Sequence, residues 1–429
     1  MQPSALPATS LAWGLPFLGI LVSIALFPMA APRFWRRYMG AVALAWSGAL
    51  LVPLAVMAGG RAAAALAWHA LLVNYLPFIA LLLALYTLGG GVLLRGGPAG
   101  TPAGNTAMLA LGMAMGALMG TAGASMVLIH PLLRANAHRR RKIHLVLFLI
   151  VLVANAAGAI SPLGNPPLYL GLLRGVPFFW PARHLLAPLA VTTVLLLAAF
   201  YLIDRHLAAR EPPAPRAQRF HLRGWGNITL ILLVIGAVFA VAYAPSTSLP
   251  VVAVFLTATA LSAWLTPSAI RQANDFTWHP ILEVAMLFAG VFVTIAPVET
   301  MLRAGLAGPL APLLHLALAD NGQPVPAASF WLAGVLSAFL DNAPTYLMFF
   351  DLAGIRPEAL VDQERVLAAI SAGAVFFGGL TYIGNAPNMV IRAVAAHRGV
   401  HMPGFFGYAA LACAVLLPVM ALLTLLFFT

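Results

Sequence analysis

Long apolar stretches, separated by short polar or basic loops, follow one another along almost the whole chain. Many of them approach 20 residues, the length that a helix needs to cross a hydrocarbon layer about 30 Å thick. The fold class that this pattern predicts is an all-α polytopic membrane protein. We expect ten crossings, at residues 11–31, 39–58, 71–94, 143–180, 184–204, 226–245, 248–266, 280–301, 364–391 and 404–428.

Two further apolar segments, 104–133 and 328–352, carry polar residues or Gly and Pro at their centres, and we predict re-entrant hairpins there. With two hairpins, 17 of the 23 Lys and Arg residues fall in loops on one side and at their margins. Basic loops stay in the cytoplasm, so this arrangement leaves both termini outside. If either segment crossed fully, basic clusters would lie on both sides.

Composition supports a membrane protein, because 62% of the residues are hydrophobic and only 8% are charged, against about 25% charged in soluble domains. The net charge of +12 and the run Arg139–Lys142 could suggest nucleic acid. Basic loops that set topology explain both, so we expect the lipid bilayer as partner and no nucleic acid. No basic region precedes the first apolar run, which predicts an anchor rather than a cleaved signal peptide. We expect a multi-pass protein of the bacterial inner membrane.

The stretch 205–225, with five arginines and three prolines, reads as a cytoplasmic linker. It divides the chain into a first repeat at 1–204 and a second at 226–429. Each half then contains five crossings and one hairpin. Because five is odd, the second half begins on the opposite side, and the two repeats are predicted to be inverted.

A shift of 220 residues supports this repeat. It places Gly120–Ser125 on Leu340–Thr345, and Ser161–Pro167 on Thr381–Pro387. Proline and glycine should interrupt the helices at 143–180 and 364–391, and the residues that break them are Gly164, Pro166, Pro167, Gly384 and Pro387. Interrupted segments at corresponding positions of two halves indicate a transporter site near the middle of the membrane.

The segment Ser337–Pro344, with its Asp-Asn-x-Pro, and the two Gly-Asn-x-Pro interruptions resemble the ion transporter superfamily. This superfamily includes citrate transporters of the CitMHS type, arsenite and sodium:proton antiporters of the ArsB/NhaD type, and dicarboxylate carriers. The resemblance implies a mobile transport domain of hairpins and broken helices, a scaffold of the other helices, and a homodimer. Unlike the dicarboxylate carriers, the chain has no Ser-Asn-Thr at a hairpin centre, and Asn165 stands where related proteins often carry Asp.

Asp341 is the most informative acidic residue, since no carboxylate occurs before Asp204. At a hairpin centre it is costly unless it is paired, protonated or ion-bound. Capping of the helix that re-enters at Pro344 is a compatible role. Hydroxyl and amide oxygens nearby suit a hard cation such as Na+. The predicted binding residues are Asp341, Asn342, Thr345, Ser125, Asn165, Asn385, Ser161 and Thr381, with Asn155 as a further candidate.

The remaining acidic residues are expected at boundaries or in loops. Glu283, four residues after His279, is either a coupling residue or one half of an interfacial ion pair. Glu299 and Asp351 are expected at the membrane boundary. Solvated carboxylates without a role are expected at Asp204, Glu211, Asp275, Asp320, Glu358, Asp362 and Glu364.

These patterns predict a secondary active transporter that exchanges Na+ for H+ by alternating access, with Asp341 holding a proton until Na+ displaces it. Cation-coupled transport of citrate or another small carboxylate is the alternative, and arsenite extrusion is a third. No nucleophile–base pair, paired carboxylates or His cluster converge in the spans, so we do not expect an enzyme. Apart from Na+ as transported or coupling ion, we expect no cofactor or metal.

Overall fold

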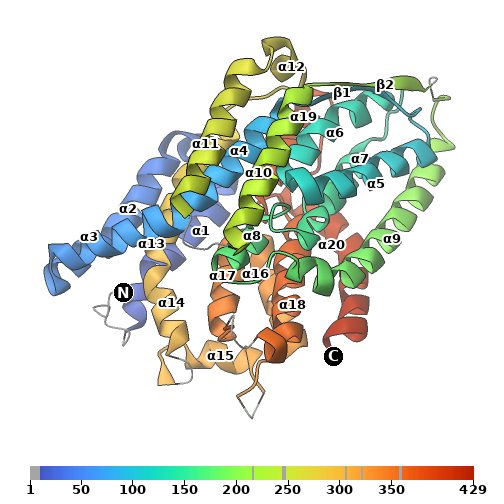
Figure 1. Ribbon diagram of the computed structural model, residues 1–429. Coiled ribbons are helices and arrows are strands. Elements are labelled where there is room, and N and C mark those ends of the chain that lie inside the picture. Colours follow the sequence, from blue (N-terminus) through green and yellow to red (C-terminus); the bar gives the residue numbers. More distant parts are fainter. Residues whose placement is uncertain (1–9, 215–216, 244–247, 305–306, 320–321, 357–359) are drawn as a thin grey trace.

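The order of the helices follows the apolar segments of the chain (Figure 1). The computed structural model describes residues 10–429 except 215–216, 244–247, 305–306, 320–321 and 357–359. The first half contains η1 (Leu11–Gly14), α1 (Leu15–Ala30), α2 (Pro32–Ala58), α3 (Gly60–Trp68), the π-helical turn η2 (His69–Tyr75), α4 (Leu76–Gly90), β1 (Leu93–Gly97), α5 (Pro102–Met119), α6 (Thr121–Ala135), α7 (Ile143–Phe148), the π-helical turn η3 (Leu149–Val153), the 3-10 turn η4 (Ala156–Ile160), α8 (Pro166–Leu173) and α9 (Trp180–Ala208).

The second half is also mostly helical. It contains β2 (Gln218–Arg223), α10 (Trp225–Tyr243), α11 (Ser248–Leu265), α12 (Ser268–Ala273), α13 (His279–Thr294), α14 (Ala296–Arg303), α15 (Ala311–Ala317), α16 (Pro326–Leu340), α17 (Asn342–Leu352), α18 (Leu360–Phe376), the 3-10 turn η8 (Phe377–Leu380), α19 (Ala386–His397), α20 (Phe405–Leu423) and the π-helical turn η9 (Thr424–Phe428).

Six helices of the described chain are long and apolar enough to cross a membrane, and a seventh span results if α13 and α14, bent by 45° at Ile295, are one crossing. The protein is therefore a multi-pass, mostly helical membrane protein. Helices α10 and α11 are apolar but shorter in their described parts. The total of ten crossings and the inverted relation of the halves stay predictions.

Burial separates the helices into a central and a peripheral group. The segment Ile143–Ile160 is 89% buried inside the molecule, whereas α2 is 17% buried. A helix that is apolar on all sides can be buried in protein or face lipid, and packing against α5, α6, α9 and α18 puts the first interrupted helix at the centre. The site described below is built around this central helix.

The β1–β2 pair is the main departure from the predicted elements. The two strands pair antiparallel, with Leu93 opposite Arg223 and Arg95 opposite His221. The crossing predicted at 71–94 therefore ends at Gly90, and it begins earlier than predicted because α3 starts at Gly60, directly after Gly59 with φ 90°. Part of the predicted linker 205–225 lies in regular elements, since α9 continues to Ala208 and β2 spans Gln218–Arg223.

Both predicted hairpins are pairs of packed helices that meet at a single residue. Helices α5 and α6 meet at Gly120, and helices α16 and α17 meet at Asp341. The first hairpin lies toward the end of the molecule that carries β1, β2 and α12, and the second lies toward the end that carries α14, α15 and the C-terminus (Figure 1). We call the first of these the basic end, because the Arg139–Lys142 loop belongs to it.

Candidate functional site

The two hairpin tips have the same backbone conformation. Gly120 has φ 80° and ψ 146°, and Asp341 has φ 74° and ψ 150°. This region of φ and ψ is nearly exclusive to glycine, and holding another residue there costs about 1–3 kcal/mol of conformational free energy. The tips lie 221 residues apart, so the shift of 220 predicted from the sequence is one residue short at the hairpins. Glycine serves at the equivalent tip of the first hairpin, so the fold alone does not require an acidic residue at position 341.

The two interruptions also match each other. Asn165 and Asn385 are extended residues that directly precede α8 and α19, and they lie 220 residues apart, as predicted. The hydroxyl of Ser161 accepts the N–H of Leu163 at 3.2 Å, and the hydroxyl of Thr381 accepts the N–H of Gly384 at 3.1 Å. These two residues therefore shape the interruptions.

Glycine is required at both interruptions by close backbone contact. A Cβ at Gly164 would lie 2.5 Å from the Cα of Gly158, and a Cβ at Gly384 would lie 2.7 Å from the carbonyl oxygen of Gly378. Pro166, Pro167 and Pro387 lie in the first turns of α8 and α19, where a missing N–H removes no helical hydrogen bond. The residues predicted to break the helices therefore also begin the helices that follow.

A cavity of about 70 Å³ lies where the tips and the interruptions meet. Helix α4 contributes Leu82, Leu85 and Tyr86, and α13 contributes Ile281, Val284 and Phe288. Of the residues predicted from the sequence, Asp341, Ser125, Asn385, Gly164, Pro166 and Pro387 line it. The volume suits a small, partly hydrated ion, since one water needs at least 10–15 Å³ by this kind of measure.

Behind the cavity, buried asparagines connect the second hairpin to both interruptions. The amide of Asn342 donates to Oδ1 of Asn165 at 2.8 Å. Asn385 donates to Oδ1 of Asn155 at 3.1 Å, and Asn155 donates to Oδ1 of Asn388 at 2.9 Å. Asn388 was missed by sequence reasoning, although a polar residue three positions after Asn385 in an apolar helix was a usable signal. Because Asn165 also donates to the carbonyl of Asn155 at 3.4 Å, the network makes the second hairpin and the two interrupted helices one interdependent unit.

Unsatisfied oxygen atoms remain around the cavity. The carboxylate of Asp341 accepts the N–H of Ala343 at 3.4 Å, and no basic side chain among the described residues forms an ion pair with it. Oγ of Ser125 and Oδ1 of Asn342 are buried without a hydrogen-bond partner in the described chain. Thr345 is occupied, since its hydroxyl donates to the carbonyl of Asp341 at 2.8 Å. Buried oxygen atoms of this kind are available to a ligand.

Four helices begin at the cavity. The first residues of α6, α8 and α19 line it, and the cap of α17 is Asp341 itself. Helix N-termini carry partial positive charge and free N–H groups, which favour anions. The cavity therefore combines a carboxylate with four positive helix ends.

Comparison with known families identifies the group to which the chain is related. The family described as "Putative citrate transport" matches residues 6–428. The chain belongs to this family. A comparison with curated proteins finds no match. The family assignment confirms the CitMHS-type resemblance and makes this protein a member of a membrane transport family.

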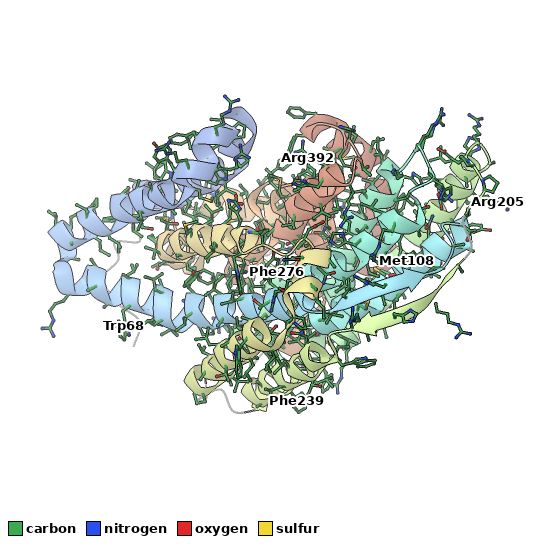
Figure 2. All side chains as sticks on the ribbon, turned by 90° about the horizontal axis from the view of Figure 1, so that it is seen from above. Trp68, Met108, Arg205, Phe239, Phe276 and Arg392 are labelled. Atoms are coloured by element: carbon green, nitrogen blue, oxygen red, sulfur yellow. The ribbon has the colours of Figure 1, made fainter. Side chains whose placement is uncertain are left out.

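In this transporter a second space adjoins the cavity on the side of the basic end. A larger space of about 650 Å³ shares Tyr86, Met126, Pro280 and Val390 with the cavity lining. We call this space the vestibule. Phe276 lines it and lies near the middle of the molecule when viewed from the basic end, far from Trp68 and Arg205 at opposite edges (Figure 2).

Two clusters of charged side chains lie beyond the cavity, one toward each end. Away from the basic end, Arg174 donates to Glu299 at 2.6 Å and to Asp351 at 3.0 Å. We call these three residues the Arg174 cluster. Glu299 and Asp351 were predicted only as boundary residues, because their shared partner is more than 100 residues away in the sequence.

At the vestibule, Arg398 donates to Asp275 at 3.1 Å, and Nδ1 of His130 lies 3.7 Å from the same carboxylate. We call these residues the Arg398 cluster.

Glu283 does not line the cavity, and its carboxylate lies 3.9 Å from Nδ1 of His279. An ion pair with His279 was the predicted alternative to a coupling role for Glu283.

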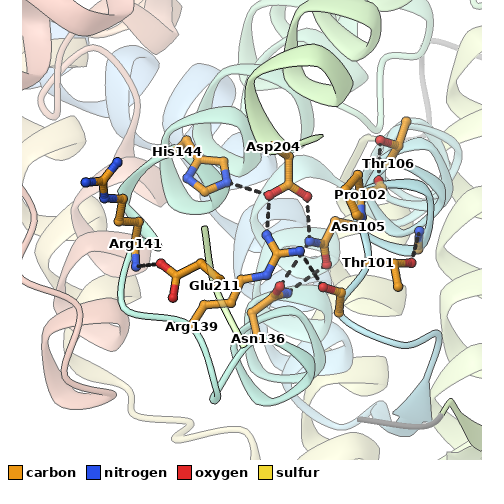
Figure 3. Close-up of polar contacts among 12 residues, drawn as sticks. Thr101, Pro102, Asn105, Thr106, Asn136, Arg139, Arg141, His144, Asp204 and Glu211 are labelled. Atoms are coloured by element: carbon orange, nitrogen blue, oxygen red, sulfur yellow. Dashed lines mark hydrogen bonds and ion pairs between the residues drawn. The ribbon is translucent and has the colours of Figure 1, made fainter. Parts of the chain in front are cut away.

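The prediction of a solvated Asp204 was wrong. Its side chain is 0% exposed and accepts hydrogen bonds from Arg139 and from Asn105 at 2.8 Å, while Nε2 of His144 lies 2.8 Å away (Figure 3). Because α9 continues past Asp204 and the loop at Arg139 folds back over it, this carboxylate is enclosed. Asp320 and Glu358, for which solvated positions were also predicted, lie outside the described residues.

Proposed function

We propose that this protein is a secondary active transporter that exchanges Na+ for H+ at Asp341. The observation that supports this most directly is an acidic side chain that lines a small cavity, in a backbone conformation normally reserved for glycine, without a basic partner in the described chain. A carboxylate at such a site must be neutralised by a proton or a cation. Because one carboxylate takes one or the other, binding of Na+ releases H+.

Oxygen ligands for the cation are at hand. Ser125 contributes an unpartnered hydroxyl from the first hairpin, and Asn385 lines the cavity from the second interruption. Hard cations prefer oxygen ligands. The cation would thus contact elements of both halves, and its binding would depend on how those elements are arranged.

In the proposed mechanism the cavity opens alternately toward the two ends of the molecule. The vestibule adjoins the cavity on the side of the basic end, which topology predicts to be cytoplasmic, while the Arg174 cluster holds α8, α14 and α17 together at the other end. In the proposed cycle this cluster separates when the site turns to the opposite side, and the Arg398 cluster then closes the vestibule.

Cation-coupled transport of citrate or another small carboxylate is the second candidate. It is favoured by the four helix N-termini around the cavity and by the name of the family. In that case Asp341 would bind the coupling cation or proton, because an unneutralised carboxylate repels an anionic substrate.

The deciding experiment is proton movement in everted vesicles that contain the protein. Na+, Li+, K+ and citrate are added separately, with Asp341→Asn as the matched variant. A pH change on addition of Na+ or Li+ that is lost in Asp341→Asn supports exchange at this site. A variant that still responds to Na+ as the parent does would contradict it. A response to citrate alone would assign carboxylate transport instead.

A further inference from the structure

A second, separate recess lies at the basic end. It is a groove of about 520 Å³ between α7, α9 and α20, and it shares no lining residue with the cavity or the vestibule. Its mouth carries Arg140, Arg141 and Lys142, and its walls are apolar side chains such as Leu147 and Leu411. The groove thus combines a cationic rim with an apolar interior.

The basic rim is held in place by its own loop. Arg139 turns inward to Asp204 and to the carbonyl of Gly100, while the backbone N–H groups of Arg140 and Arg141 each donate to Glu211 at 3.0 Å. The side chain of Arg141 extends away from this cluster (Figure 3). Because Glu211 anchors the backbone of this loop, the side chains of Arg140, Arg141 and Lys142 are placed together at the mouth of the groove.

The charges of these three residues are only partly balanced within the described chain. In the part of the chain that the structure describes, Arg140, Arg141 and Lys142 form no ion pair, and both arginine side chains are exposed. The carboxylate of Glu211 offsets part of this positive charge, and the remainder attracts an anion with several oxygen atoms. Arginine and lysine together are suited to a phosphate group.

The walls indicate which kind of phosphate compound fits. Leu411 of α20 and Ile203 of α9 are exposed, and both helices are among the candidate membrane spans. In a bilayer such faces contact acyl chains, at the level where the helices reach the headgroups. Basic pockets between membrane helices at this level bind anionic lipid headgroups. A soluble phosphate compound would use the rim and leave the walls unoccupied.

We propose that this groove binds one anionic phospholipid, with the phosphate at Arg140, Arg141 and Lys142 and an acyl chain along Leu147 and Leu411. The inference is independent of which substrate the transporter carries. Each basic residue near an anionic lipid contributes roughly a fivefold factor in affinity, so loss of all three should weaken binding on the order of 100-fold.

The test is native mass spectrometry of the full-length protein in detergent, titrated with dioleoyl phosphatidylglycerol or with phosphatidylethanolamine of the same chains. The variant replaces all three rim residues (Arg140→Gln, Arg141→Gln, Lys142→Gln). The control removes three charges at the start of α2 (Arg33→Gln, Arg36→Gln, Arg37→Gln). We expect preferential binding of phosphatidylglycerol by the parent and the control, and its loss in the rim variant.

Two outcomes would overturn the proposal. If both triple variants lose the lipid equally, overall surface charge and not the groove is responsible. If glycerol 3-phosphate displaces phosphatidylglycerol at equal concentration, the ligand is a soluble phosphate compound. Should the triple variant not fold, Arg140→Gln and Arg141→Gln singly, whose side chains are exposed, should each weaken binding roughly fivefold; no change in either would also contradict the proposal.

Discussion

Arg174 and Arg398 occupy the same place in the two interrupted helices. Each is the C-cap of the short helix after the interruption, and each precedes Gly-Val. Each also contacts a carboxylate on another element: Asp351 for Arg174, and Asp275 for Arg398. The Arg174 side chain is 22% exposed and that of Arg398 is 39% exposed. The cluster away from the vestibule is therefore the more enclosed of the two.

Arg174→Gln should open the end that the Arg174 cluster closes, because it leaves the carboxylates of Glu299 and Asp351 without their shared cation. Ser125→Cys in a Cys413→Ala background reports access to the cavity. We expect a membrane-impermeant maleimide to label the parent reporter only from the basic end, and the Arg174→Gln reporter from both sides. Arg183→Gln, an exposed arginine of α9, serves as control. Labelling of the Arg174 variant from the basic end alone would exclude a closing role for the cluster.

Asp341→Gly should raise stability while it abolishes the cation response. Glycine adopts φ 74° freely, so relief of strain contributes about 1–3 kcal/mol. Asp341→Ala also removes the charge but retains the strained conformation, and the difference between the two variants isolates the backbone contribution. Thermal unfolding in detergent measures it. Equal midpoints for the glycine and alanine variants would show that the conformation is not strained.

Asp204→Asn should destabilise the fold by about 3 kcal/mol, because removal of one partner from a buried ion pair leaves Arg139 buried and uncompensated. Glu211→Gln is the matched control, since Glu211 is exposed and holds only the surface loop. Chemical unfolding of the purified protein compares the two. An effect of Asp204→Asn no larger than that of Glu211→Gln would mean that the pair contributes little net stability.

Acidification should release the loop that carries the basic rim. The N–H groups of Arg140 and Arg141 hold the pKa of Glu211 below its usual range. A lowered pKa means that this anchor is fully present above the ordinary pKa of a glutamate and is lost as pH falls through the lowered value. Hydrogen exchange of residues 138–142, corrected for intrinsic rates, should be slower in the parent than in Glu211→Gln at pH 7 and equal in strongly acidic solution. Equal protection already at pH 7 would contradict this.

The sequence alone predicts well where helices break and turn, and it predicts poorly which distant residues come into contact. Hairpins and interruptions were predictable because Gly, Pro and Asn act on the backbone at their own positions, as Gly120 and Asn165 do. The bond between Asn342 and Asn165 joins residues 177 positions apart, and no local pattern specifies it. The same holds for Asp204, whose burial depends on where the loop at Arg139 folds. The role of the predicted site residues in ion binding stays a prediction.

The β1–β2 pair has a mechanical consequence. It joins residues 93–97 to residues 218–223. The first hairpin, the first interrupted helix and α9 lie between these two strands in the sequence, so the pair brings the start and the end of that stretch together. The strands flanking this stretch also connect directly to α4 and α10, which pack against each other. The stretch from α5 to α9 is thus tied at both of its ends to one pair of adjacent strands, in addition to its packing against α4, α17, α18, α19 and α20. Because the strand pair at the basic end fastens both ends of this stretch to the same place, the chain cannot separate its entry from its exit there without breaking the strand pairing.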